Sequence, residues 1–199
     1  MTPLESLTLE HVPAHYAVHV CLFQDVQNPA FLHQQLLARN PDFEYAFIDA
    51  AAILSRIHLL SAIFKAINTH HTGSLRTPNI HSETVVSLSP SSNIAEAYRR
   101  FGISQSTKSL IAIKISALSD ADSGAEAVED RIWSHLGTHV AGTPAPLTDA
   151  NISLVSNLQT IRKNYKLNGL NWIEAIGDES RKKSETEKLI VAALALRGI

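Results

Sequence analysis

The segment His81–Ser104 joins a strand pattern to a helix pattern, and it constrains the fold more than any other part of the chain. Its first part carries Val85, Val86 and Leu88 close together, so it predicts a buried strand over Ile80–Leu88. A proline follows and cannot donate to a sheet ladder. The strand is therefore expected to stop there.

The second part of this segment predicts a short capped helix. Asn93 stands where an N-cap is needed, and Glu96 follows three residues later, as in a capping box. Apolar side chains then recur at helical spacing from Ile94 to Phe101. Gly102 is expected to end the helix as its C′ residue.

Strand and helix patterns alternate along the rest of the chain. Further strands are predicted at Tyr16–Phe23 and Leu110–Ile115. The other expected helices are Ala30–Ala38, Ala50–His71 with Asp49 as N-cap, one passing through Trp133 and Leu136, one from Ile152 to Tyr165, and Lys188–Leu196. Residues 1–199 are interpreted as one α/β (α+β) domain of two layers, with helices packed on a small mixed β-sheet. Polar stretches at 119–126 and 177–187 are expected to be mobile loops.

The helix expected over Ala50–His71 is apolar around most of its circumference. One set of apolar residues at helical spacing is assigned to the core: Ile53, Ile57, Leu60, Phe64 and Ile67. Leu59 and Ile63 lie partly off this stripe. Such a helix is either buried on two sides or forms part of an interface.

Composition excludes several classes of protein. The net charge of −2 gives no general basic field for nucleic acid, so any RNA contact must be a local patch. A single cysteine, Cys21, excludes an internal disulfide framework and suits a reducing compartment. The first residues lack the apolar core of a signal peptide, and no apolar run reaches the roughly 18 residues of a membrane span. We expect a soluble intracellular protein without membrane contact.

Residues typical of catalytic or metal sites do not form a complete set. His11, His15 and His19 are spaced by four, but a proline interrupts them and no cysteine pair supports zinc. His58 lies near Asp49 on the expected long helix, yet the intervening serine is on the wrong side for a relay. The chain also lacks a glycine-rich phosphate loop. We expect no enzymatic activity, no cofactor and no metal.

Four segments in order resemble the PRPK-binding protein family, the small non-catalytic subunit of the EKC/KEOPS complex, with fungal-like features. They are PDFEYAFIDAAAILSRIHLLSAIFKAI at Pro41–Ile67, the HSE…LSPSSNIAEAYRRFGIS run at His81–Ser104, IRKNYKL at Ile161–Leu167, and the closing ALALRGI. This chain departs from the family pattern at Ser91 and Ser92, which replace the asparagines usual after LSP.

The resemblance implies a function in tRNA modification. EKC/KEOPS forms threonylcarbamoyladenosine at tRNA position 37, and this subunit binds the complex's small atypical kinase and the single-stranded 3′ CCA end of tRNA. Its contact with the threonylcarbamoyl transferase subunit is expected to be indirect. The expected location is nucleus and cytoplasm, and fungal members suggest a telomere role.

The implied binding residues are candidates on two surfaces. Those for tRNA are Asn93, Arg99, Arg100, Phe101 and Lys108, which combine cations for phosphate with a ring for base stacking. Those for the kinase are Leu59, Ile63, Ile190 and Leu194. Each set has an alternative: the arginines can be capping charges in the last turn of a helix, and the apolar residues can be core.

Two other functions remain open at the level of sequence. One is a kinase-binding scaffold or regulator that never contacts RNA, which suits the nearly neutral charge. The other is a small-molecule enzyme that uses His58 with an acidic partner.

Overall fold

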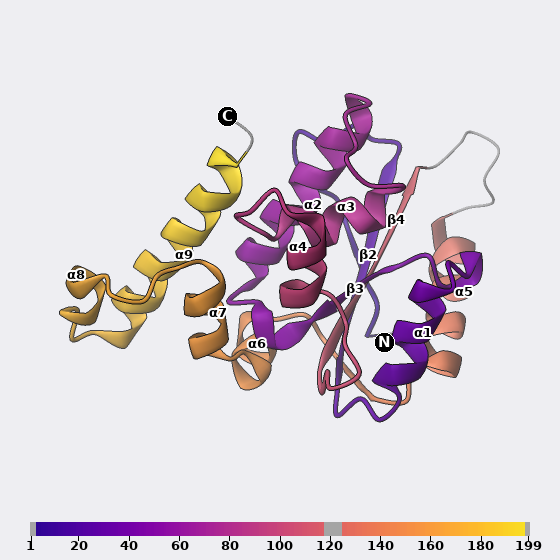
Figure 1. Cartoon of the computed structure of the whole chain (residues 1–199). Helices are drawn as coiled ribbons and strands as arrows, with labels where there is room; N and C mark the ends of the chain where they lie inside the picture. The colour runs from indigo at the N-terminus through magenta and orange to yellow at the C-terminus, as the bar shows by residue number, and fades with distance from the viewer. Residues whose placement is uncertain (1–2, 118–124, 198–199) are drawn as a thin grey trace.

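The computed structural model describes residues 3–117 and 125–197, which form an antiparallel sheet with helices on both faces (Figure 1). The strands are β1 (Glu5–Leu7), β2 (Tyr16–Gln24), β3 (Ala46–Asp49), β4 (Leu110–Ala117) and β5 (Thr143–Ala145). Their order is β1-β2-β4-β3, and β5 also pairs with β2. Every described pairing is antiparallel. The prediction of a mixed sheet is therefore wrong.

Two hydrophobic cores lie on opposite faces of the sheet, because side chains alternate along each strand. On β2, Val18, Val20 and Leu22 enter the larger core. Cys21 and Phe23 enter the smaller one. The prediction of one α/β domain is confirmed, and the helices form a layer on each face where one layer was expected.

The smaller core lies under α1 (Pro29–Leu37) and α5 (Ala125–His139). The other helices lie on the side of the larger core (Figure 1). They are α2 (Arg56–His71), α3 (Ile80–Ser87), α4 (Ile94–Phe101), α6 (Asp149–Val155), α7 (Leu158–Asn164), α8 (Asn171–Glu174) and α9 (Glu179–Leu196). Short 3₁₀ turns, η1 (Pro41–Phe43) and η2 (Ala50–Ala52), flank β3. The helices at 30–38 and 94–101 and the strands at 16–23 and 110–115 are confirmed.

The long helix begins later than expected. Asp49 caps the short η2 turn by accepting from Ala51 N (2.9 Å). The N-cap of α2 is Ser55, whose Oγ accepts from His58 N at 3.1 Å. The predicted helix Ile152–Tyr165 is likewise two helices, because Ser156 leaves the helical path and donates to Ile53 O (2.5 Å).

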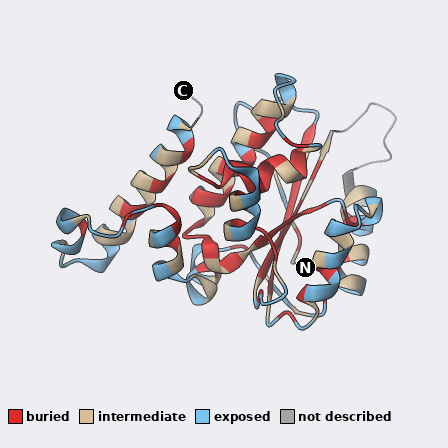
Figure 2. Ribbon diagram, viewed as in Figure 1, coloured by how far each residue is buried: buried red, intermediate tan, exposed pale blue. Residues whose placement is uncertain are grey.

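The strand predicted at Ile80–Leu88 is wrong, because this segment is helix α3 with Asn79 as N-cap. Most of its side chains are buried, as Figure 2 shows, so its sequence lacks the polar face that marks a helix. The helix covers the part of β4 that extends beyond β3. There His81 Nε2 accepts a hydrogen bond from Ile115 N (3.0 Å).

The mobile loop predicted at 177–187 is also wrong. Asp178 caps α9 by accepting from the amides of Ser180 and Arg181, and the helix is continuous from Glu179. Its first turns are charged and pair with α8, where Lys182 Nζ lies 3.2 Å from Glu174. Of the other predicted loop, residues 119–124 lie outside the described residues, and 125–126 begin α5.

Candidate protein and nucleic-acid interfaces

The four residues expected to bind the kinase belong to the core of the monomer. Leu59, Ile63 and Ile190 are fully buried, and Leu194 is 2% exposed. All four pack in the larger core, where α2 meets α9 and the sheet. The kinase-binding assignment of Leu59, Ile63 and Ile190 is therefore wrong, and the alternative of burial within the monomer is correct. Leu194 is buried as well, but it borders the groove described next.

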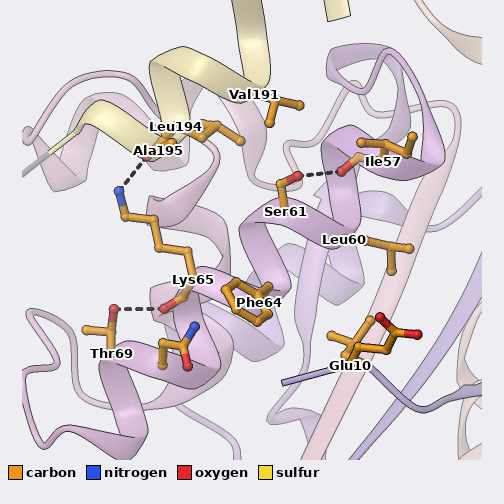
Figure 3. A pocket seen from close by; sticks show the side chains of 12 residues that line it. Glu10, Ile57, Leu60, Ser61, Phe64, Lys65, Thr69, Val191, Leu194 and Ala195 are labelled. Carbon is orange, nitrogen blue, oxygen red and sulfur yellow. Dashed lines mark hydrogen bonds between the residues drawn. The ribbon is translucent and has the colours of Figure 1, made fainter. Parts of the chain in front are cut away.

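The opposite side of α2 forms an apolar groove with α9, and Figure 3 shows it from close by. Ile57 is 55% exposed and Phe64 is 38% exposed. The groove has a volume of about 570 Å³ and is bordered by Ile57, Leu60, Phe64, Val191, Ala195 and Leu9. We call it the α2–α9 groove. The predicted core stripe is thus correct for Ile53 and Ile67, which are fully buried. Its other three members, Ile57, Leu60 and Phe64, border the groove instead.

A partly buried lysine, Lys65, lines the α2–α9 groove. Lys65 Nζ donates to Leu194 O (2.5 Å), a bond drawn in Figure 3. It also donates to Arg197 O (2.7 Å), so both carbonyls at the end of α9 are bonded to this lysine. The last carbonyls of a helix generally lack a partner within it, so a cation at this end is stabilising. Burial lowers the pKa of Lys65, and repulsion by Arg197 and Arg76 adds to the effect. The side chain therefore fastens α9 onto α2.

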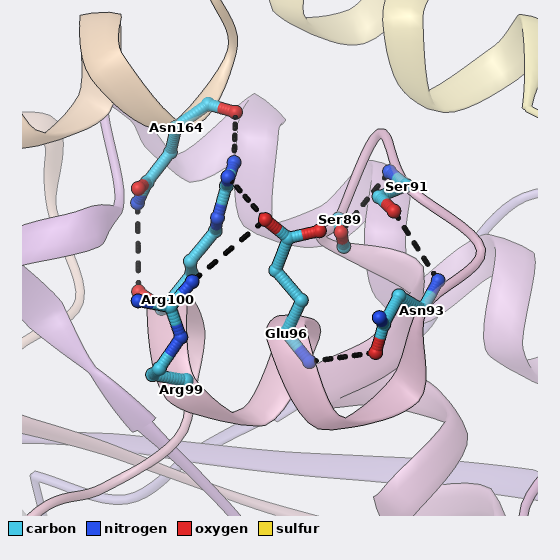
Figure 4. A network of polar contacts seen from close by, with 7 residues as sticks. All are labelled: Ser89, Ser91, Asn93, Glu96, Arg99, Arg100 and Asn164. Atoms are coloured by element: carbon cyan, nitrogen blue, oxygen red, sulfur yellow. Dashed lines mark hydrogen bonds and ion pairs between the residues drawn. The ribbon is translucent and has the colours of Figure 1, made fainter.

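The capped helix α4 follows a loop whose polar side chains bond to one another (Figure 4). Ser89 Oγ accepts from Ser91 N (3.1 Å), and Ser91 Oγ accepts from Asn93 N (3.2 Å). Asn93 Oδ1 then accepts from Glu96 N (3.0 Å), which confirms the predicted N-cap. The carboxylate of Glu96 turns toward Arg100 and leaves the capping box half complete.

The two arginines of α4 have different roles. Arg100 Nη1 donates to Asn164 O at the end of α7 (2.8 Å), and its Nη2 donates to Glu96. It is a brace between two helices, with a side chain 21% exposed. Arg99 is 75% exposed, and its Nη2 lies 3.8 Å from Glu96. Of the pair, only Arg99 is placed to meet a phosphate.

Phe101 cannot stack on a base, because it is fully buried. Its ring lies 5.7 Å from that of Tyr165, within the larger core. The aromatic ring that α4 exposes is Tyr98. Lys108 is exposed in the loop before β4, where its carbonyl accepts from Val26 N (2.8 Å). Within the described residues, no hydrogen bond or ion pair joins its side chain to α4.

His58 is a structural residue, so the enzyme hypothesis that used it is wrong. Its Nδ1 accepts from Leu54 N (3.2 Å), and its Nε2 bonds to Tyr165 Oη (2.7 Å). Tyr165 Oη donates to Leu88 O at 2.5 Å, so Nε2 carries the proton. Burial lowers the pKa of His58 to about 3. A fully buried, neutral imidazole without an acidic partner cannot reach a substrate.

Two kinds of site are absent from the described residues. None of the helices there is long and apolar enough to cross a membrane. Across residues 3–117 and 125–197, no three His, Cys, Asp or Glu side chains converge so that they could hold a metal ion.

Comparisons with known proteins give the family. The model of the kinase binding protein CGI-121 family matches residues 23–198. A protein of Gibberella zeae named EKC/KEOPS complex subunit CGI121 is 54% identical over 98% of this chain and 99% of its own length. Proteins of the same name from Neurospora crassa and Schizosaccharomyces pombe are 46% and 33% identical, over 98% and 75% of this chain and 99% and 82% of their own lengths. These matches confirm the resemblance seen in the sequence, and the chain belongs to the CGI-121 kinase-binding family.

Proposed function

We propose that this chain is a non-catalytic subunit of an EKC/KEOPS complex and that it binds the complex's small atypical kinase in the α2–α9 groove. The observation that carries this proposal is the exposed apolar side of α2, because residues such as Ile57 and Phe64 gain little by facing water. The family and the names of the relatives support a kinase as the partner.

The test of this surface is a charge placed on its rim. Ile57→Glu would bury an unpaired carboxylate in the complex, which costs about 3–5 kcal/mol and weakens kinase binding by at least about 100-fold. The monomer should keep its circular dichroism spectrum and melting temperature, because the side chain is half exposed.

The matched control is Leu154→Glu, which makes the same change at an exposed leucine on α6, outside the groove. It should bind the kinase as the unmodified chain does. Equal binding by Ile57→Glu and Leu154→Glu would show that the kinase binds elsewhere.

A second surface for the 3′ CCA end of tRNA is proposed at α4, in support of threonylcarbamoyladenosine formation at tRNA position 37. Arg99 supplies an exposed cation, and Tyr98 supplies an exposed ring on the same helix. Asn93 and Lys108 are exposed on either side of α4 in the sequence. Contact with the threonylcarbamoyl transferase subunit would then be indirect, through the shared tRNA and kinase.

Titration with tRNA tests this surface. Arg99→Glu should weaken binding about tenfold and flatten the salt dependence by about one counterion, because one phosphate contact is lost. Removal of the CCA end should weaken binding by the unmodified chain. Arg131→Glu on α5 is the control for net charge.

The alternative is a kinase-binding scaffold without RNA contact. Its support is the net charge of −2 together with the use of Arg100 as a brace, which leaves α4 with fewer free cations than its sequence suggests. If intact tRNA and tRNA without its CCA end bind equally, or if neither binds, the scaffold is the better account.

A further inference from the structure

The last described residue of the chain reaches the loop in front of α4. Arg197 follows α9, and its Nη1 donates to Val86 O and to Ser89 O (3.1 Å). The guanidinium is partly buried, and this burial lowers the pKa of Arg197. Two carbonyls at the end of α3 and the start of the loop are thus held by one side chain from α9.

The same arginine is fixed from the side of the α2–α9 groove. Lys65 donates to the carbonyls of Leu194 and Arg197, so α2 holds the backbone from which the Arg197 side chain extends. Lys65 and Leu194 both line the groove. A partner in the groove would therefore contact the residues that keep Arg197 in place.

From Ser89 the polar contacts continue without a gap to α4. The side chain of Ser89 accepts a hydrogen bond from the amide of Ser91, and that of Ser91 accepts one from the amide of Asn93. The side chain of Asn93 in turn accepts one from the amide of Glu96 (Figure 4). Each of these bonds fixes one step of the short loop between α3 and α4. Ser89 is fully buried, so its position depends on the residues packed around it, including Arg197.

We propose that Arg197 is a positioning residue that couples the α2–α9 groove to the loop Ser89–Asn93, so that a kinase docked in the groove makes this loop more rigid. The proposal deepens the proposed function and rests on it for the identity of the groove's partner. Its physical basis is that ligand contacts which restrain one end of a packed chain of bonds reduce the motion of the other end.

The experiment is amide hydrogen exchange, followed by NMR for Ser91, Asn93 and Glu96 in the full chain. Arg197→Ala should raise the exchange rates of these amides at least about tenfold, with a smaller rise in Arg197→Lys, which keeps a donor. Arg181→Ala, an exposed arginine at the other end of α9, is the matched control and should leave them unchanged. Addition of the kinase should slow exchange at these amides in the unmodified chain and not in Arg197→Ala.

Two outcomes would overturn the proposal. One is unchanged exchange of the loop in Arg197→Ala. The other is a rise that core amides such as that of Ile113 share, since that would show a general loosening of the fold. No tRNA is present in this experiment, so a failed tRNA titration would reject the proposed RNA surface and leave the exchange result to decide the role of Arg197. Failure of the kinase to bind at all would reject the proposed function, while the comparison of variants without kinase would still decide the positioning role.

Discussion

Two buried histidines should make the fold sensitive to mild acid. His58 is fully buried and His81 is 4% exposed. Burial lowers the pKa of each to about 3, and for His81 the nearby Lys114 adds to the effect. In the unfolded chain both imidazoles return to a pKa of about 6.5.

The direction of the effect follows from these values. Between pH 6.5 and pH 3 these two imidazoles are protonated in the unfolded chain and neutral in the folded chain. The free energy of unfolding therefore falls as the pH falls. At pH 5 the difference spans about 1.5 pH units, which corresponds to about 2 kcal/mol for each histidine.

Urea unfolding at pH 8 and pH 5 measures this loss. The sharpest comparison is between the unmodified chain and His81→Gln, because the amide oxygen of glutamine can still accept from Ile115 N. The variant should lose about 2 kcal/mol less stability than the unmodified chain over this pH range. The same loss in both proteins would refute the assignment of His81 as a buried neutral imidazole.

Two further predictions concern the surroundings of α4. Arg100→Ala should lower the free energy of unfolding by about 1–3 kcal/mol, because Asn164 O and Glu96 lose a charged donor, whereas Arg99→Ala should change it by less than about 0.5 kcal/mol. Equal effects in urea unfolding would contradict the distinction between brace and free cation. Gly102→Ala should cost about 1–3 kcal/mol, because the added methyl group would lie 2.8 Å from Tyr98 O, while Gly177→Ala meets nothing within 4 Å and serves as control. A melting temperature of Gly102→Ala equal to that of the control would show that the helix end adjusts freely.

The elements that sequence predicts correctly are those with local signals. The strand that became β2 is rich in β-branched residues, and α4 has Asn93 as its cap and a clear helical period. Helix α3 was predicted as a strand because nearly all its side chains are buried, and the sequence around Val85 and Val86 resembles that of a buried strand. The first half of α9 was predicted as a loop because it is charged and lacks apolar residues at helical spacing. Its ion pair with α8 is a tertiary contact that the local sequence does not show.

Burial decided which site residues were predicted correctly. The helical period of α2 shows two apolar faces but does not say which one meets the sheet. The small residues Ala62 and Ala66 were the available signal, because they allow α2 to pack closely on the side of Leu59 and Ile63. For α4 the sequence located the exposed Arg99 but could not show that Arg100 finds Asn164, which lies 64 residues away in the chain.

The most direct test of the central claim is site-specific photo-crosslinking to the kinase. A photoreactive residue replaces Ile57 at the rim of the α2–α9 groove or, as control, Trp172 on α8, which is 50% exposed and outside the groove. We predict a crosslink to the kinase from position 57 and none from position 172. A crosslink from position 172, with none from position 57, would contradict the assignment of the groove as the kinase-binding surface.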